Sequence, residues 1–257
     1  MAIVTLTTDF GLSDHYVGVM KGVILGIAPA VRIVDISHQS SAYEIGEGAF
    51  LIAQAYRYFP KKTVHVIVVD PGVGTARRPI LAEAAGQYFV APDNGVLGLI
   101  FRQEKHKVRV VTNTRYFLKP VSQTFHGRDI FGPVGAYLAK GVAPARMGKP
   151  IQDYLRPALG APERTGKHFW TGSVLKIDHF GNVVTNFRLS DIPDGPFELV
   201  LGPHVVTKRS SNYAEWGPGE LFTIVGSSGY LEIATGQGSA AKILGCSAGA
   251  PVELRIY

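Results

Sequence analysis

With 257 residues and 46% hydrophobic content, the chain is long enough to form one large domain or two modest ones, each with a packed core. Its single cysteine, Cys246, excludes an intramolecular disulfide and a cysteine-rich zinc site, and without a recognisable signal peptide or membrane-length apolar run we expect a soluble, cytoplasmic protein. The formal net charge of +6 comes from scattered basic pairs such as Lys61 and Lys62, so we expect no nucleic-acid partner and no membrane partner.

Strands and helices alternate in the first part of the chain. A strand is predicted from Ile3 to Thr8, and helical apolar spacing follows from His15 to Ala28. A second strand from Val31 to Ile36 and a second helix from about Tyr43 to Phe59 precede a third strand that begins at Val64. This βαβαβ order predicts a parallel sheet.

The third predicted strand ends at an acid. Its branched apolar run from Val64 to Val69 lacks alternation, which is typical of a strand covered on both faces, and Asp70 and Pro71 then lead the chain out of the sheet. Asp9 follows the first strand in the same way. Because α/β sheets bind ligands beyond the carboxyl ends of their strands, Asp9 and Asp70 are predicted to line one crevice.

The remaining patterns divide the chain into two domains. In the first we expect a hairpin of Pro79 to Ala84 and Gln87 to Ala91, a tight turn at 92–95, a short helix from Val96 to Arg102, a strand from Val108 to Val111 and a helix from about Ile130 to Lys140. Residues 161–167 are polar and rich in helix breakers, as linkers are. Short strands separated by turn residues then follow at Gly172 to Ile177, Val183 to Phe187, Phe197 to Leu201, Leu221 to Val225, Tyr230 to Ala234 and Val252 to Ile256. The predicted fold is an α/β domain with a mostly parallel sheet at 1–160 and a smaller all-β, barrel-like domain at 168–257.

The glycine-containing loop after the third strand has two interpretations. Gly72 and Gly74 begin a G-x-G-x-x-G dinucleotide pattern, but Arg77 replaces its third glycine, and no P-loop sequence is present. Arg77 can instead fold back across the turn towards Asp70 and keep that carboxylate ionised. Taken alone, Asp70 is more often a turn carboxylate and His126 a helix-capping residue, so spacing leaves both interpretations open.

Two polar loops stand out in the second domain, at 178–182 and 227–230. Hairpin turns are the default interpretation of both. The histidines lack the paired spacing of a metal site, so we expect a protein without a metal ion.

Five short motifs occur in order along the chain. They are Thr8 to Gly11, Asp70 to Thr75 with Arg77, Thr124 to Asp129, Asp178 to Asn182, and Ser227 to Ala234. Together they resemble the S-adenosyl-L-methionine hydroxide adenosyltransferase family, whose relatives include fluorinase and chlorinase. The resemblance covers nearly the whole chain and both domains.

This resemblance implies an enzyme that hydrolyses S-adenosyl-L-methionine (SAM) at C5′ to adenosine and L-methionine by backside attack of an oriented water or hydroxide. SAM is then the substrate, and no cofactor is needed. The family also implies a homotrimer, with each site formed between the N-terminal domain of one subunit and the C-terminal domain of its neighbour.

The family's functional residues carry over to matching positions. The resemblance makes Asp70, Arg77 and His126 the catalytic triad that handles water. Substrate contacts fall to Asp9 at the ribose hydroxyls, Tyr43 beside the ligand, Phe125 at the reacting centre, Asn182 at adenine, Asp178 and Ser227 at the methionine end, and Gln237 in the loop that follows the 230–234 strand.

Two departures from related sequences bear on these roles. The halogenating relatives have Tyr in place of Asp70 and lack the Arg and His of the triad, which favours water over halide as the nucleophile. Gly236 stands where many relatives have Asn, which leaves only backbone contacts at that position. A SAM-dependent halogenase and a non-catalytic SAM- or adenosine-binding protein remain the alternatives.

Overall fold

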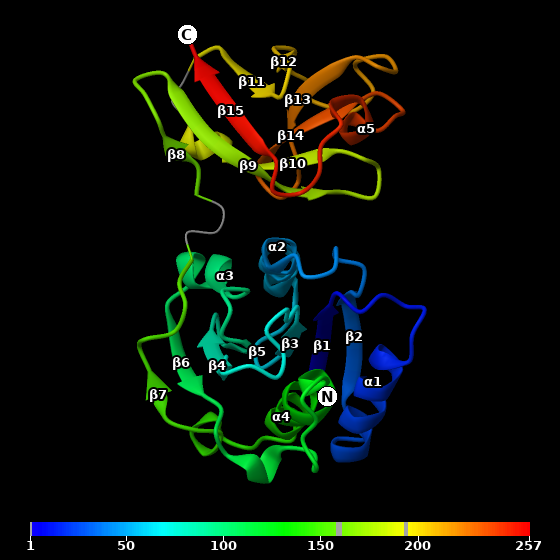
Figure 1. Cartoon of the computed structure of the whole chain (residues 1–257), viewed down its shortest axis with the longest axis vertical. Coiled ribbons are helices and arrows are strands. Elements are labelled where there is room, and N and C mark those ends of the chain that lie inside the picture. The colour runs from blue at the N-terminus through cyan, green and yellow to red at the C-terminus, as the bar shows by residue number, and fades with distance from the viewer. Residues whose placement is uncertain (1, 158–160, 193–194) are drawn as a thin grey trace. The chain divides into compact units, whose positions relative to one another are not determined.

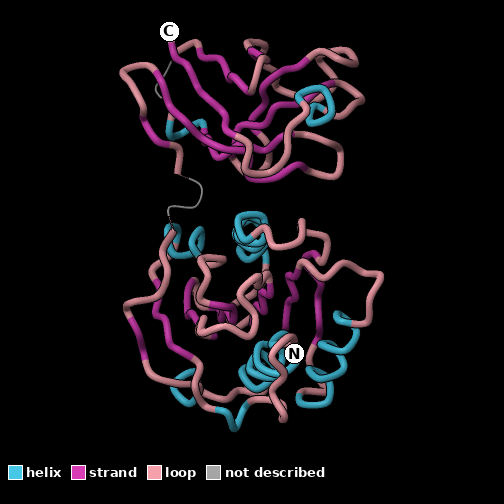
Figure 2. The backbone as a smooth tube through the Cα atoms, viewed as in Figure 1, coloured by secondary structure: helices cyan, strands magenta, loops and turns pink. Residues whose placement is uncertain are grey.

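The computed structural model describes residues 2–157, 161–192 and 195–257. The chain divides into two compact units, Met1–Leu159 and Gly160–Tyr257. Figure 2 shows that the first unit mixes helices and strands, whereas the second is built mostly of strands. Within the described residues, no helix is long and apolar enough to cross a membrane.

The first unit is built on a seven-stranded mixed sheet with the order β2-β1-β3-β5-β4-β6-β7. The strands are β1 (Ile3–Thr8), β2 (Arg32–Ser37), β3 (Val64–Val68), β4 (Pro79–Ala84), β5 (Gln87–Pro92), β6 (His106–Val110) and β7 (Pro150–Ile151). Pairing is parallel from β2 through β5, which confirms the predicted βαβαβ arrangement. Pairing is antiparallel beyond β5, because the hairpin through Ala85 and Gly86 reverses the chain.

Helices cover this sheet. They are α1 (Tyr16–Ile27), α2 (Ile45–Ala55), α3 (Gly98–Gln103) and α4 (Gly132–Ala139), with single turns η1 (Tyr56–Tyr58), η2 (Thr114–Tyr116), η3 (Gly127–Phe131) and η4 (Pro144–Arg146). Helices α1 and α4 pack against each other on one face of the sheet (Figure 1). The helix predicted from Ile130 starts earlier than expected, as the π-helical turn η3 that continues into α4. This early start brings residues beside His126 into a helical segment.

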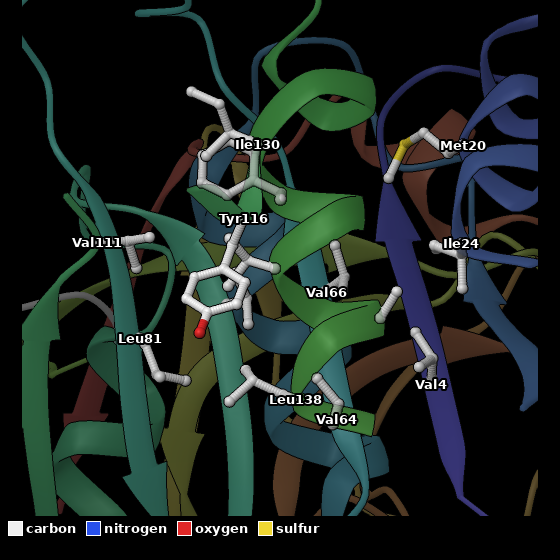
Figure 3. Close-up of a cluster of buried hydrophobic side chains, with 14 of the residues drawn as sticks. Val4, Met20, Ile24, Val64, Val66, Leu81, Val111, Tyr116, Ile130 and Leu138 are labelled. Atoms are coloured by element: carbon white, nitrogen blue, oxygen red, sulfur yellow. The ribbon is translucent and has the colours of Figure 1, made fainter. Parts of the chain in front are cut away.

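Strand β3 is buried on both faces of the sheet, as its sequence predicts. Val64 and Val66 pack into a hydrophobic cluster with side chains of α1 and α4, among them Ile24 (Figure 3). His65 and Ile67, which alternate with them and face the opposite side, are also 0% exposed. A strand fixed from both sides gives the residues that follow it a rigid base.

The second unit is a nearly closed antiparallel barrel with the order β12-β11-β15-β9-β10-β14-β13. Its elements are β8 (Glu163–Arg164), β9 (Phe169–Ile177), β10 (Val183–Arg188), η5 (Leu189–Asp191), β11 (Phe197–Leu201), β12 (His204–Val206), β13 (Leu221–Val225), β14 (Tyr230–Thr235), α5 (Ala240–Leu244) and β15 (Pro251–Ile256). The gap between β12 and β13 is bridged where Arg209 pairs with Thr223. All six predicted strands are present, whereas β8, β12 and α5 were not predicted.

The predicted linker at 161–167 contains a short strand. Glu163 and Arg164 form β8, which pairs with Thr171 and Trp170 of β9. Polar residues there therefore sit at the edge of the second unit's sheet, and residues 158–160 lie outside the described part of the chain.

Candidate active site

Two acids meet at the carboxyl edge of the parallel strands. Asp9 follows β1 and Asp70 lies just beyond β3, and both line one cavity of about 280 Å³ together with Tyr43, Phe125 and His126. The prediction that the two acids share a crevice is therefore confirmed. Parallel strands β1 and β3 are hydrogen-bonded neighbours, which is why residues far apart in sequence arrive together.

Arg77 joins Asp70 to His126. Its Nε donates a hydrogen bond to Asp70 Oδ1 at 2.9 Å, and its Nη2 donates to Asp70 Oδ2. The same Nη2 lies 2.6 Å from His126 Nδ1. The side chains of Arg77 and Asp70 are only 9% and 4% exposed, so this bidentate pair is shielded from water. The three residues of the predicted triad form one hydrogen-bonded group.

This group fixes the state of the histidine. Because an arginine can only donate, Nδ1 of His126 must accept and so carries no proton. Burial lowers the pKa of His126 and the charge of Arg77 lowers it further, while Asp70 opposes both effects. Among the described residues that line the cavity are Asp70 and His126 but not Arg77. The guanidinium therefore supports the two cavity-facing groups from behind.

Contacts distant in sequence hold the loop that carries Asp70 and Arg77. Gly74 has a φ of +78°, and a Cβ there would lie 2.3 Å from the backbone oxygen of Gln123, in the segment leading to His126. Asn94 donates from Nδ2 to the carbonyl of Val69 at 2.8 Å, directly before Asp70. The sequence predicts a tight turn at Asn94 from its Pro-Asp-Asn-Gly pattern, but it does not reveal that the Asn94 side chain supports the loop of Asp70.

Asp9 is held by the backbone of Tyr43. The Tyr43 N–H donates to Asp9 Oδ2 at 2.9 Å, which the left-handed backbone of Tyr43, with a φ of +70°, makes possible. Burial raises the pKa of Asp9, and the nearby Asp70 charge raises it further, whereas the hydrogen bond from the Tyr43 N–H lowers it. The Tyr43 ring is 71% exposed at the cavity rim.

Aromatic rings form one wall of the cavity. Phe10, Tyr16 and Phe125 pack edge to face or tilted, with ring centroids 5.2 to 5.9 Å apart. Phe125 is 9% exposed and all three line the cavity. Such a wall excludes water from the side of the cavity next to His126.

In the second unit, Asp178 and Asn182 close a turn. The Asp178 carboxylate accepts hydrogen bonds from the backbone N–H groups of Phe180 and Asn182 at 2.9 and 2.8 Å, and from Asn182 Nδ2 at 2.9 Å. Both side chains therefore organise the loop itself. Their contacts with a ligand stay a prediction.

The other predicted positions of this unit lie in two turns. Ser227 is exposed in a turn closed by the Gly229 N–H on the Gly226 carbonyl at 2.9 Å. Gln237 is exposed and has a left-handed backbone, with a φ of +48°.

Gly236 has no room for a side chain. A Cβ at this position would lie 2.0 Å from the backbone oxygen of Trp216. The glycine that departs from related sequences is therefore required by the close approach of the 208–217 segment.

Sequence reasoning missed a buried acid in the same region. Glu232 on β14 is 7% exposed and accepts a hydrogen bond from the Tyr213 hydroxyl at 2.9 Å. Burial raises the pKa of Glu232, the Tyr213 hydrogen bond opposes this, and the charge of Asp178 adds to it. Burial and the bond to Glu232 raise the pKa of Tyr213 to about 12. The sequence did contain a signal for this buried acid, because Glu232 interrupts an otherwise apolar strand.

The described ranges hold no group of three His, Cys, Asp or Glu side chains that could bind a metal ion. The polar groups of the cavity instead pair with one another and with backbone amides. The arrangement suits a small ligand with hydroxyl groups on the Asp9 side and a water molecule on the Asp70 side.

Models of two consecutive domains of one family match the chain. The SAM hydroxide adenosyltransferase N-terminal domain matches residues 4–148, and the corresponding C-terminal domain matches residues 172–253. The two matches fall in the two compact units.

Proteins similar over the full length carry consistent names. The (R)-S-adenosyl-L-methionine hydrolase of Salinispora tropica is 38% identical over 253 residues, covering 96% of this chain and 95% of its own. The enzyme of the same name from Thermus thermophilus is 36% identical, covering 99% and 100%. The fluorinase of Nocardia brasiliensis is 28% identical, covering 99% and 97%.

A solved structure shares the fold. The crystal structure of an uncharacterized conserved protein from Thermotoga maritima aligns with a TM-score of 0.87 and 34% identity, covering 99% of this chain and 100% of that one.

Proposed function

The chain belongs to the SAM hydroxide adenosyltransferase family, and we propose that it hydrolyses SAM at C5′ to adenosine and L-methionine. The observation that carries this proposal is the hydrogen-bonded group of Asp70, Arg77 and His126 at the cavity. The similar hydrolases are named for the (R) form. Because "L" already describes the methionine carbon, the (R) label describes the sulfonium, and we propose that diastereomer as substrate.

The reaction needs a positioned nucleophile more than an acid. The oxygen of water forms a bond to C5′ as the C5′–S bond breaks, and the electron pair of that bond stays on sulfur. The leaving group departs as a neutral thioether, so no proton has to be supplied to it. Holding water in line with the C5′–S bond can remove several kcal/mol of the barrier.

Asp70 is the group that receives the proton in this proposal. Each of its oxygens accepts from Arg77 and keeps a lone pair for the O–H of the attacking water. Nδ1 of His126 is occupied by Arg77, so His126 keeps the guanidinium in place. The positive charge of Arg77 favours hydroxide character in the transition state. The aromatic wall beside Phe125 keeps other water away from the sulfonium.

The remaining roles follow the family pattern. We propose that Asp9 binds the ribose hydroxyls, that Tyr43 and Phe125 contact the nucleoside and the reacting centre, and that the second unit supplies the loops for adenine and methionine. Those loops contain Asp178, Asn182, Ser227 and Gln237.

We further propose a cytoplasmic homotrimer that works without a metal ion, each site being completed by a neighbouring subunit. The exposed rings of Tyr43 and Phe180, 71% and 75% exposed, support a site that a partner surface covers. Light scattering of the purified protein measures the oligomer directly.

The decisive test is product analysis. Purified protein is incubated with each sulfonium diastereomer of SAM in ¹⁸O-labelled water, with and without chloride and with and without EDTA. We expect the (R) diastereomer to give adenosine that carries the label at the 5′ oxygen, in every salt and chelator condition. A 5′-chloro-5′-deoxyadenosine product identifies a halogenase instead, and intact SAM after long incubation identifies a binding protein.

A further inference from the structure

His38 is a buried histidine beside the cavity that does not line it. It is 4% exposed and follows β2, and its Nδ1 lies 2.9 Å from the hydroxyl of Thr8 at the end of β1. Its Nε2 lies 3.1 Å from Asp35 Oδ1. Thr8 is the residue directly before Asp9.

These contacts connect His38 to both sides of Asp9. On the N-terminal side, His38 contacts the Thr8 hydroxyl, which also accepts the N–H of Phe10 at 3.3 Å. On the C-terminal side, the His38 carbonyl accepts the N–H of Gly11 at 2.7 Å. The carboxylate of Asp9 therefore projects from a loop that residue 38 holds at both ends, through its side chain at Thr8 and through its backbone carbonyl at Gly11.

The two ring nitrogens of His38 face Thr8 on one side and Asp35 on the other. Nε2 of His38 is buried without a hydrogen bond of good geometry, and the nearest charge is the carboxylate of Asp35 at 3.1 Å. We therefore assign the ring proton to Nε2, which leaves Nδ1 to accept from the Thr8 hydroxyl. Lys21 Nζ donates to the other oxygen of Asp35 at 2.5 Å. The Thr8 hydroxyl is 0% exposed, so it cannot react with a ligand and acts only as a link.

We propose that the His38 side chain is a positioning group for ribose recognition, acting on Asp9 through the Thr8 hydroxyl. This inference rests on the proposed role of Asp9. A carboxylate binds two neighbouring hydroxyl groups well only when both of its oxygens are correctly placed, so freeing the loop weakens that contact in particular.

A second buried histidine that contacts a threonine of β1 supplies a matched control. His65 is also buried, and its Nδ1 lies 2.7 Å from the hydroxyl of Thr5 on β1. Thr5 precedes Asp9 by four positions and His65 makes no contact with the 9–11 loop among the described hydrogen bonds. Comparing the two histidines thus separates the general effect of removing a buried histidine from the specific effect on Asp9.

The test measures ribose selectivity by calorimetry. The affinities for adenosine and for 2′-deoxyadenosine are compared in wild type, His38→Ala, His38→Asn and His65→Asn. Wild type is expected to prefer adenosine, and His38→Ala to lose about tenfold of that preference, the value of one hydrogen bond to a charged group. The amide oxygen of His38→Asn can still accept from Thr8, so this variant is expected to keep most of the preference. His65→Asn is expected to keep all of it, whatever its stability.

Two further variants make the result interpretable. Thr8→Val removes the linking hydroxyl with little change of shape, and because the Phe10 N–H then also loses its acceptor, we expect at least the loss seen in His38→Ala. This variant keeps the test open where His38→Ala fails to fold. In an Asp9→Asn background, His38→Ala is expected to add no further loss. A His38→Ala protein with the wild-type preference overturns the role of His38 alone, provided that wild type hydrolyses SAM. Wild type that neither cleaves SAM nor binds adenosine overturns the proposed function as well.

Discussion

Arg77 Nη2 donates a hydrogen bond to His126 Nδ1 over 2.6 Å while the same guanidinium holds both oxygens of Asp70. The histidine is therefore an acceptor within the group, and its pKa is lowered first by burial and then by the charge of Arg77. Protonating His126 breaks the contact that places the guanidinium. Turnover should consequently depend on which atom replaces Nδ1.

We expect His126→Asn to retain more activity than His126→Gln. The shorter amide places its oxygen where Nδ1 lies and can still accept from Arg77, whereas the longer one reaches the position of Nε2. A fall in kcat of about 100-fold is expected for Gln, against about tenfold for Asn, with little change in KM. Steady-state kinetics with SAM measure both constants. Equal rates for the two variants contradict the acceptor role.

Arg77→Lys is expected to lower kcat by about 100-fold or more, because an ammonium cannot hold both oxygens of Asp70 and the ring of His126 in one plane. Arg78→Lys is the matched control. Arg78 donates to Asp93 Oδ2 at 2.7 Å and to Asp153, and it lies outside the residues that line the cavity. Its replacement should alter thermal stability and leave turnover unchanged. A similar loss of turnover in both variants would mean that the effect is general.

Gly74→Ala tests the close approach of the two catalytic loops. Gly74 and Gly141 both have a positive φ, +78° and +92°, so alanine at either costs about 1 kcal/mol of stability. A Cβ at Gly141 meets nothing within 4 Å, whereas at Gly74 it would lie 2.3 Å from the Gln123 oxygen. We expect Gly74→Ala to lose about 2 kcal/mol more and at least about tenfold in kcat. Urea unfolding and kinetics compare the two, and equal effects contradict the argument.

The elements of the fold were predictable where the signal is local. Strand β1 and the hairpin of β4 and β5 lie within a residue of their predicted bounds, because branched apolar runs there end at Gly, Pro or acidic residues. Strand β12 was missed because it has only three residues, too few to show a strand pattern. Strand β8 was missed because its residues are polar and exposed, and only pairing with β9 makes them a strand.

The site shows the same division. The pairing of Asp70 with Arg77 follows from seven residues of spacing across a glycine turn, and the meeting of Asp70 with Asp9 follows from parallel strands. The contact of Gly74 with Gln123 spans residues that no periodicity connects. The same holds for the hydrogen bond between Tyr213 and Glu232, which depends on how the segment before β13 folds back over β14. The type of a residue indicates which chemistry its side chain can perform, whereas the residues that it contacts are decided by tertiary packing.

The stability of the first unit should fall on mild acidification because of His65. This side chain is 0% exposed, its ring nitrogens meet Thr5 and Gln87, and it stacks on Phe89 with centroids 4.8 Å apart. Burial lowers the pKa of His65 to about 4, from an ordinary value of 6.5. Below about 6.5 the unfolded chain takes up a proton that the folded protein accepts only near 4, so acid favours unfolding.

The expected loss is about 3 kcal/mol of unfolding free energy between these two pKa values. Urea unfolding near pH 7 and near pH 5 covers about 2 kcal/mol of this loss. The comparison is His65→Gln, since a glutamine can meet Thr5 and Gln87 without titrating. His126 also has a lowered pKa and acts in the same direction, so His126→Asn is needed as a second comparison. We expect the pH dependence to become much shallower in His65→Gln than in His126→Asn, because His65 is the more deeply buried of the two. An unchanged slope in His65→Gln would show that the core already accommodates the charged ring.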